Sequence, residues 1–405
     1  MRENLSQLGE WIDSRMSFAV ATVIDTQGSA PRQPGALMAV AANGRVLGSI
    51  SGGCVESAVY EAAREVLASG RPQLHVYGVS DTDAFEVGLT CGGTIRVLIQ
   101  AFGAATRWGG LRDVLGAMAR AEPVAAATVV GGSAVVGSAV VGNVGARAGS
   151  SAGHAATTLG ARLIIRAPEV LGSLGDPVLD AAVTDDARGF LAQGTTAVCR
   201  YDENGGRVAA GCAADVEVFI QTFAPPPRML VFGATDYAAA TARMGVFLGY
   251  RVTVCDARPV FATRERLPDG VEVVRAWPHD YLAATEIDER TVLCVLTHDP
   301  KFDIPLLVRA LRTPAGYIGV MGSRRTHDQR CAQLRAEGVD EAALVRLASP
   351  IGLDLGARTP EETAVSIAAE IIGTRWGGSG RSLSGLTGDI HRPARAAAVR
   401  AGRTG

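Results

Sequence analysis

A cysteine beside paired glycines stands early in the chain, where its type and spacing could do chemistry. The segment 51–56 reads Ser-Gly-Gly-Cys-Val-Glu and lies between an expected strand and an expected helix. Gly52 and Gly53 let a ligand approach the backbone closely, and N–H groups at a helix start attract an anion. The helix dipole also stabilises a thiolate there, so Cys54 is predicted to be a metal ligand or a nucleophile. The alternative is a tight turn that packs a small cysteine.

A second thiol with two glycines follows at Cys91-Gly92-Gly93, where another strand is expected to begin. Two such elements favour a pocket in which both thiols face one ligand. Cys212 holds the equivalent position in an internal repeat that lacks the other motifs, and this favours a structural role for Cys91 instead. Both interpretations stay open.

An arginine-bearing loop precedes these motifs. The segment 28–32 reads Gly-Ser-Ala-Pro-Arg and follows a strand expected to end at Ile24. The guanidinium fork of Arg32 matches the oxygens of a phosphate or a carboxylate. The alternative is a turn with an exposed arginine.

Further along, Gly233 follows an apolar strand and precedes a helix, and the next strand ends in Asp256. This is the layout of a dinucleotide-binding fold, in which the acid takes a ribose hydroxyl. Thr235 stands where the second glycine of the fingerprint belongs and would crowd a pyrophosphate, and Asp236 after it would repel one. The sequence therefore predicts the fold but not tight NAD(P) binding.

Two later strands also end in polar residues. Carboxyl ends of parallel strands border the ligand crevice, so these residues are candidates by position. They are His298, Asp299, Ser323 and Arg324. His298 and Asp299 could transfer protons, although an aspartate before a proline also suits a helix cap.

Composition limits the elements that can position these residues. The chain has 405 residues, 47% of them apolar, and its 39 basic and 41 acidic side chains leave a net charge of −2. We expect no nucleic-acid partner from this balance, and a cytoplasmic protein from the seven unclustered cysteines and the missing signal peptide. Residues 123–146 carry no charge, but their glycines and valines favour strands over a membrane span.

The chain is expected to be α/β, with a Rossmann-like doubly wound parallel sheet after a duplicated α+β unit. In the first unit, strands Phe18–Ile24, Leu37–Val40 and Ile95–Ile99 surround a helix at Glu56–Ala68. The expected domains are 1–120, a degenerate repeat at 121–224, the Rossmann-like domain at 228–375 and a disordered tail at 376–405.

The repeat rests on matching pieces about 120 residues apart. Gly-Ala-Leu-Met at 35–38 answers Gly-Ala-Arg-Leu at 160–163, and the run 91–102 matches 212–223. The Gly-Ser pair at 48–49 recurs at 172–173, and Glu-Ser-Ala at 56–58 recurs as Asp-Ala-Ala at 180–182. The second copy has nothing like the 28–32 motif and reads Gly-Asp-Pro-Val where Cys54 is expected, so any site belongs to the first copy.

Together these motifs resemble the XdhC/CoxI family. The resemblance covers residues ~18–102 and ~228–373 and extends to the segments Gly-Val-Met-Gly-Ser-Arg-Arg (319–325) and Pro-Ile-Gly-Leu-Asp-Leu-Gly-Ala-Arg-Thr-Pro-Glu-Glu (350–362). It implies an accessory protein that binds molybdenum cofactor, as molybdopterin or its nucleotide form, during sulfuration and delivers it to a molybdenum hydroxylase such as xanthine or carbon monoxide dehydrogenase.

The resemblance also implies partners and a site. The partners are the apo hydroxylase and a cysteine desulfurase, and the oligomeric state stays open, with a homodimer as one alternative. Cys54 is the candidate ligand of the metal. The candidate cofactor-binding residues are Arg32, Gly52, Gly53, Cys54, Glu56, Cys91, Gly92, Gly233, Asp256, His298, Asp299, Ser323 and Arg324.

A cofactor-maturation chaperone is therefore expected rather than a turnover enzyme. The first alternative is an NAD(P)-dependent oxidoreductase that uses His298 as its acid–base group. The second is a docking adaptor with no occupied site, because the second copy persists without the motifs.

Overall fold

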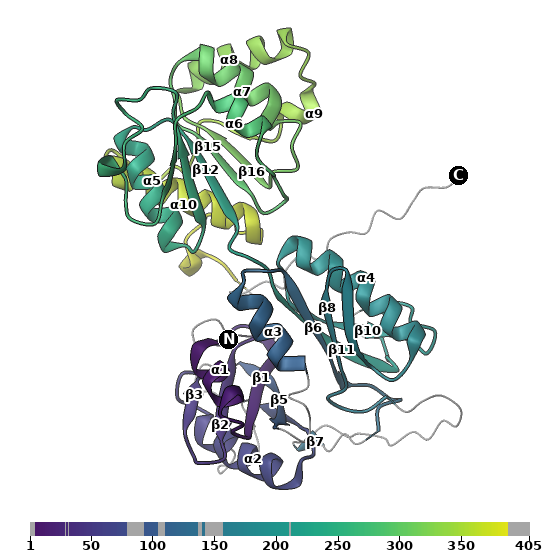
Figure 1. The fold of residues 1–405 in the computed structure, drawn as a ribbon. Helices are drawn as coiled ribbons and strands as arrows, with labels where there is room; N and C mark the ends of the chain where they lie inside the picture. Colours follow the sequence, from purple (N-terminus) through teal and green to yellow (C-terminus); the bar gives the residue numbers. More distant parts are fainter. Residues whose placement is uncertain are drawn as a thin grey trace, which may run out of the picture. The chain divides into compact units, whose positions relative to one another are not determined.

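The computed structural model describes residues 5–28, 30, 32–78, 93–103, 110–136, 140–141, 157–209 and 212–387. The chain divides into two compact units at Pro225/Pro226. Each unit has its own sheets and cores, and each is described by itself (Figure 1). None of the helices in the described ranges is long and apolar enough to cross a bilayer.

The N-terminal unit opens with a six-stranded sheet in the order β3-β2-β1-β5-β4-β7. Its elements are α1 (Leu5–Asp13), β1 (Phe18–Gln27), β2 (Leu37–Ala41), β3 (Val46–Gly48), α2 (Glu56–Ser69), β4 (Gln73–Tyr77), β5 (Thr94–Phe102) and α3 (Leu111–Ala119), with β7 (Val140–Val141) at the edge. The predicted strands and the helix at 56–68 are present, and β1 runs past Ile24 to Gln27. Helix α3 leads from this sheet to the next one.

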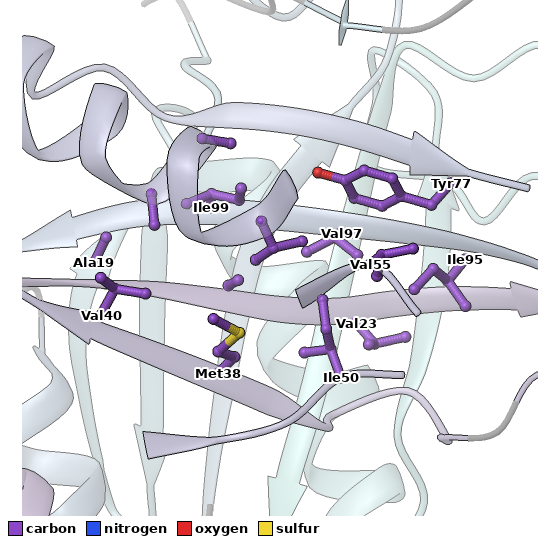
Figure 2. Packing of buried hydrophobic residues seen from close by; sticks show 14 of the residues in the cluster. Ala19, Val23, Met38, Val40, Ile50, Val55, Tyr77, Ile95, Val97 and Ile99 are labelled. Atoms are coloured by element: carbon purple, nitrogen blue, oxygen red, sulfur yellow. The ribbon is translucent and has the colours of Figure 1, made fainter. Parts of the chain in front are cut away.

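Alternation of apolar residues explains how α2 meets this sheet. Val23, Val97 and Ile99 lie on the same face of the sheet, because successive side chains on a strand point to opposite faces. Val55 and Val59, at the start of α2, lie in the same buried cluster, and Figure 2 shows its side chains between the helix and the strands. This cluster fixes where α2 begins over the sheet.

A second sheet follows in the order β10-β11-β6-β8-β9. Its elements are β6 (Val124–Gly131), β8 (Arg162–Arg166), β9 (Glu169–Ser173), α4 (Pro177–Gln193), β10 (Ala197–Tyr201) and β11 (Val216–Phe223). Helix α4 packs on one face, as α2 does on the first sheet. The uncharged stretch that begins at 123 thus supplies β6, a central strand, as its valines and glycines predicted.

The two sheets pack together through the faces that α2 and α4 leave open. Ile24 and Leu98 of the first sheet share a buried cluster with Val130 and Phe219 of the second. The side-chain amide of Gln100 donates to the Gly160 carbonyl at 3.0 Å.

The reciprocal bond is also present: the Gln221 amide donates to the Gly35 carbonyl at 3.1 Å. Gln100 and Gln221 match in the repeat, as do Gly35 and Gly160. Arg96 and Glu217, a third matched pair 121 residues apart, bond to each other at 2.8 Å. The contacts between the sheets are therefore related by an approximate two-fold axis.

The C-terminal unit is a parallel sheet in the order β14-β13-β12-β15-β16-β17. Its elements are β12 (Arg228–Phe232), α5 (Asp236–Phe247), β13 (Arg251–Cys255), β14 (Glu272–Val274), α6 (Pro278–Ala283), β15 (Val292–Val295), α7 (Pro300–Ala310), β16 (Tyr317–Val320), α8 (Arg324–Ala336), α9 (Glu341–Leu344), β17 (Leu347–Ala348) and α10 (Pro360–Trp376). Short 3₁₀ turns lie at Arg264–Arg266 and Leu383–Gly385.

Helices cover both faces of this sheet. Ala238 of α5 and Ile367 of α10 belong to the core on one face, whereas Leu306 of α7 and Leu334 of α8 belong to the core on the other. The order reverses between β12 and β15, which is the topological switch point of a Rossmann fold. The predicted doubly wound sheet is confirmed. Most of the tail expected from 376 lies outside the described residues.

Candidate functional site

The segment before α2 is folded around one carboxylate. Helix α2 begins at Glu56, and its N-cap residue Val55 contributes no side-chain cap. The Glu56 side chain turns back along the loop and accepts hydrogen bonds from the N–H groups of Ser51, Gly52 and Gly53 at 2.9–3.0 Å. The amides of the glycine pair are therefore directed at the chain's own carboxylate.

Two hydroxyl groups complete this arrangement. Ser49 donates to Glu56 at 2.7 Å, and the Ser51 hydroxyl donates to the other carboxylate oxygen. Burial favours the neutral acid, but the bonds from Ser49 and Ser51 outweigh it and hold the pKa of Glu56 far below its ordinary value. Glu56 is thus an anion at neutral pH, in the position that a ligand's anionic group would take.

This finding corrects one expectation from the sequence. The N–H groups of Gly52 and Gly53 were expected to point at a ligand, and they donate to Glu56 instead. The physical reason is that a glutamate at the first helical position is long enough to reach back over the turn that precedes it.

The outer side of the same loop is open. Gly52 and Gly53 are exposed and have φ values of +83° and +125°, where a side chain would be strained. A Cβ atom built on either one meets nothing within 4 Å among the described residues. A flat ligand can therefore lie against this stretch of backbone.

Cys54 follows directly and is partly buried. It packs against the core cluster under α2, and its N–H donates to the Ser51 hydroxyl at 3.0 Å. The residue stands between the exposed glycines and the start of α2 along the chain. This placement suits a thiol that meets a ligand at the surface of the unit.

The other candidates of this unit are described only in part. Arg32 is exposed, and Ala30 two residues earlier is buried in the core cluster that Cys54 packs against. Cys91 and Gly92 lie outside the described residues. No group of three histidine, cysteine or carboxylate side chains within the described ranges could hold a metal ion.

The second copy shows what this loop becomes without the thiol. Asp180 matches Glu56 in the repeat and accepts from the Leu174 N–H at 2.8 Å. The N–H groups of Val178 and Leu179 donate to Asp176, which caps α4. An ordinary helix cap therefore occupies the position at which the first copy has two exposed glycines and the partly buried Cys54.

In the C-terminal unit, Gly233 and Asp256 lie at the carboxyl ends of β12 and β13. Gly233 has a φ of +100°, and a Cβ atom there would come within 2.9 Å of the Thr297 side chain. Asp256 is 3% exposed and accepts from the Ala234 N–H at 2.8 Å. Arg258 donates to both of its oxygens at 2.9–3.0 Å.

These contacts define the chemistry that Asp256 can offer. Burial disfavours its charge, but the bonds from Arg258 and Ala234 lower its pKa below the ordinary value. Both carboxylate oxygens are engaged within the chain, so a ribose hydroxyl would compete with Arg258 for them. Through its bond to the Ala234 N–H, Asp256 connects the carboxyl end of β13 to the carboxyl end of β12.

The remaining candidates divide into helix caps and exposed groups. Asp299 accepts from the Lys301 N–H at 3.1 Å and caps α7, and Ser323 accepts from the Thr326 N–H and caps α8. His298 and Arg324 are exposed beside these caps. The first turn of α8 contains no acidic residue, so its N-terminal end is strongly positive.

Sequence reasoning missed a buried ion pair beneath these loops. Asp303 of α7 pairs with Arg330 of α8 at 3.1 Å, and each is at most 4% exposed. The Thr297 hydroxyl donates to Asp303, and Arg330 donates to the Met321 carbonyl at 3.1 Å. The available signal was a charged residue on the apolar face of each helix, Asp303 in α7 and Arg330 in α8. Nothing in the sequence shows that these two side chains meet.

Comparisons with known proteins follow this division of the chain. A family model described as the XdhC Rossmann domain matches residues 229–371. A model described as the XdhC and CoxI family matches twice, at 11–78 and 144–202. The second match falls on the copy that lacks the thiol.

Three curated proteins are similar to the chain. YqeB of Escherichia coli K12 is 29% identical over 217 residues, which span 52% of this chain and only 40% of that protein. A protein of Bacillus subtilis described as a probable xanthine dehydrogenase subunit is 24% identical over 91% of this chain and 97% of its own length. The molybdenum cofactor insertion chaperone PaoD of E. coli K12 is 24% identical over 90% and 86%.

A solved structure shares the fold. The crystal structure of a xanthine dehydrogenase from Bacillus halodurans aligns with a TM-score of 0.63 and 22% identity. The alignment covers 95% of this chain and 98% of that one. At this identity the likeness concerns the fold alone.

Proposed function

The chain belongs to the XdhC and CoxI family, and from this premise we propose that it binds molybdenum cofactor and delivers it to a molybdenum hydroxylase. The cofactor is the cargo of such a protein. Its relatives include one named as a molybdenum cofactor insertion chaperone and one named as a probable xanthine dehydrogenase subunit. In this proposal the chain also supports sulfuration of the cargo before its insertion, together with a cysteine desulfurase.

The observation that carries the proposal is the difference between the two copies at the start of their helices. The first copy exposes Gly52 and Gly53 beside the partly buried thiol of Cys54, and the second copy has a capped helix instead. A pyranopterin is flat and its dithiolene holds molybdenum through sulfur, so open glycine backbone next to a soft thiol suits both parts. Glu56 keeps the loop in this conformation.

Each unit, taken by itself, offers a group that suits an anion. The exposed guanidinium of Arg32 can pair with a phosphate, and the start of α8 offers Arg324 and Arg325 with helix N–H groups. In this proposal the C-terminal unit binds a nucleotide tail when the cargo carries one. The contacts that already occupy both oxygens of Asp256 weigh against tight NAD(P) binding.

The test is co-purification of the full chain from cells that make molybdenum cofactor, followed by molybdenum and pterin analysis. We expect both in the wild type, and a loss of about tenfold or more in Cys54→Ser and Arg32→Ala, because each removes a charged or metal-binding contact. Cys212→Ser is the matched control, since Cys212 is an exposed cysteine of the second copy.

Two results would contradict the proposal. One is a wild-type protein without molybdenum and pterin, and the other is equal cofactor content in Cys54→Ser and Cys212→Ser. Fluorescence titration with NAD(H) and NADP(H) tests the oxidoreductase alternative. Micromolar binding with redox turnover that His298→Ala abolishes would favour that enzyme.

A further inference from the structure

A cavity of about 30 Å³ lies between the two sheets of the N-terminal unit, away from the Cys54 loop. One buried water needs roughly 10–15 Å³ of such space, so the cavity suits two waters or one small ion. Most of its lining is apolar. The polar side chains that reach it are Thr22, Gln100, Thr128, Arg162 and Gln221.

The repeat explains most of this lining. Gln100 matches Gln221, and Thr22 and Thr128 hold the same register in β1 and β6. Thr22 lies opposite Leu37 in the first sheet, and Thr128 lies opposite Arg162 in the second. The approximate two-fold axis therefore passes through the cavity, and Arg162 stands where the first copy has a leucine.

This exchange replaces an apolar side chain with a cation. Leu37 is 3% exposed and packs in an aromatic and aliphatic cluster. Arg162 instead donates from Nε to the Thr128 hydroxyl at 3.1 Å and from Nη2 to the side-chain Oε1 of Gln100 at 2.8 Å. Its guanidinium also lies 5.0 Å from the centre of the Phe102 ring.

All of these partners are neutral. Burial lowers the pKa of Arg162 to about 10, so the guanidinium stays charged at neutral pH. No carboxylate in the described part of the chain pairs with it, and its bonds there use two of the five N–H groups that a guanidinium carries. Arg162 is only partly buried, and an opposite charge beside it would offset the cost of holding its charge next to apolar side chains.

We propose that this cavity is a binding site for a small planar monoanion of the carboxylate or oxoanion type, held by Arg162. The guanidinium fork matches two oxygens of such an ion, and the amides of Gln100 and Gln221 lie at the same cavity. Formate, nitrate and bicarbonate have the charge and size. Bound there, the anion joins the two sheets and stabilises the unit.

The experiment compares sodium formate with sodium chloride at equal ionic strength on the full chain. We expect formate to raise the melting temperature of the wild type by a few degrees and chloride to raise it less. Isothermal titration of formate should show one site, and Arg162→Leu should weaken it by about tenfold or more. Arg162→Leu introduces the residue that the first copy has at this position, so we expect the variant to fold. Circular dichroism checks that it does.

Two variants sharpen the test. Arg162→Lys keeps the charge without the fork and should bind formate more weakly than the wild type but more tightly than Arg162→Leu. Arg188→Leu, at an exposed arginine of α4, should bind as the wild type does. The proposal is overturned if the wild type shows no formate binding, if chloride stabilises it equally, or if Arg162→Leu responds as the wild type does.

Discussion

At the scale of single residues, Glu56 is the side chain whose placement changes the interpretation of the candidate site. A glycine pair at a helix start is usually understood as an anion site, because its N–H groups face outward. Here the chain supplies the anion itself, and the loop is organised by its own carboxylate. In the proposed function, the ligand therefore meets the exposed backbone of Gly52 and Gly53 together with Cys54.

Replacing this carboxylate tests that interpretation. We expect Glu56→Gln to lower the free energy of unfolding by about 1–2 kcal/mol at pH 7, because N–H and hydroxyl donors lose a charged acceptor. Urea unfolding measures this change. The control is Glu61→Gln on the exposed side of α2, which should change stability by less than about 0.5 kcal/mol.

The same residue predicts a pH dependence. The pKa of Glu56 in the folded protein lies below its ordinary value of 4.5. Its contribution is therefore complete at pH values above 4.5 and is lost as the pH falls below that value. Unfolding curves between pH 3 and 7 should show a smaller acid loss in Glu56→Gln than in the wild type, and equal losses would contradict the role assigned to this carboxylate.

At the scale of elements, the loops that end β15 and β16 depend on the helices behind them. Asp303 of α7 and Arg330 of α8 meet at 3.1 Å, and Arg330 also bonds the Met321 carbonyl just after β16. Thr297 connects the same carboxylate to the end of β15. One buried pair thus positions the loops that carry His298 and Arg324.

Breaking the pair should destabilise these elements. Asp303→Asn leaves Arg330 buried without its counter-charge, and we expect a loss of about 3–5 kcal/mol in the free energy of unfolding. Chemical denaturation followed by circular dichroism measures it. Asp328→Asn, at an exposed position of α8, is the control and should stay near the wild type; a similarly small effect for Asp303→Asn would contradict the role of the pair.

At the scale of the whole molecule, the two sheets of the N-terminal unit pack on each other through contacts related by an approximate two-fold axis, as two subunits of a symmetric dimer do. The matched glutamines bond across the interface in both directions, and Glu217 bonds Arg96 of the opposite sheet and Arg200 of its own. The C-terminal unit has a Rossmann-like sheet of its own, and the candidate residues are divided between these two units. The proposed function therefore assigns a separate task to each unit.

Glu217 is the residue to change at this scale. Burial opposes its charge, but Arg96 and then Arg200 hold its pKa below the ordinary value. We expect Glu217→Gln to lower stability by about 2–4 kcal/mol at pH 7, because two arginines lose their partner between the sheets. Glu169→Gln removes an exposed pair with Arg166 and should cost no more than about 1 kcal/mol in the same urea titration. Equal effects of the two variants would show that the interface does not depend on Glu217.

The amino-acid sequence alone predicted the parallel sheet, the strands of the first unit, the internal repeat and the family resemblance. These features depend on local patterns: apolar alternation, glycine turns and motifs of adjacent residues. Only the tertiary structure decided that Glu56 accepts hydrogen bonds from the N–H groups of Ser51, Gly52 and Gly53, and that Arg258 bonds both oxygens of Asp256. The same is true of Arg162, which has no carboxylate partner in the described part of the chain. Each of these contacts depends on where two side chains lie in space, and the residue pattern of one segment does not give that distance. The charge state of a side chain depends on the same spatial neighbours.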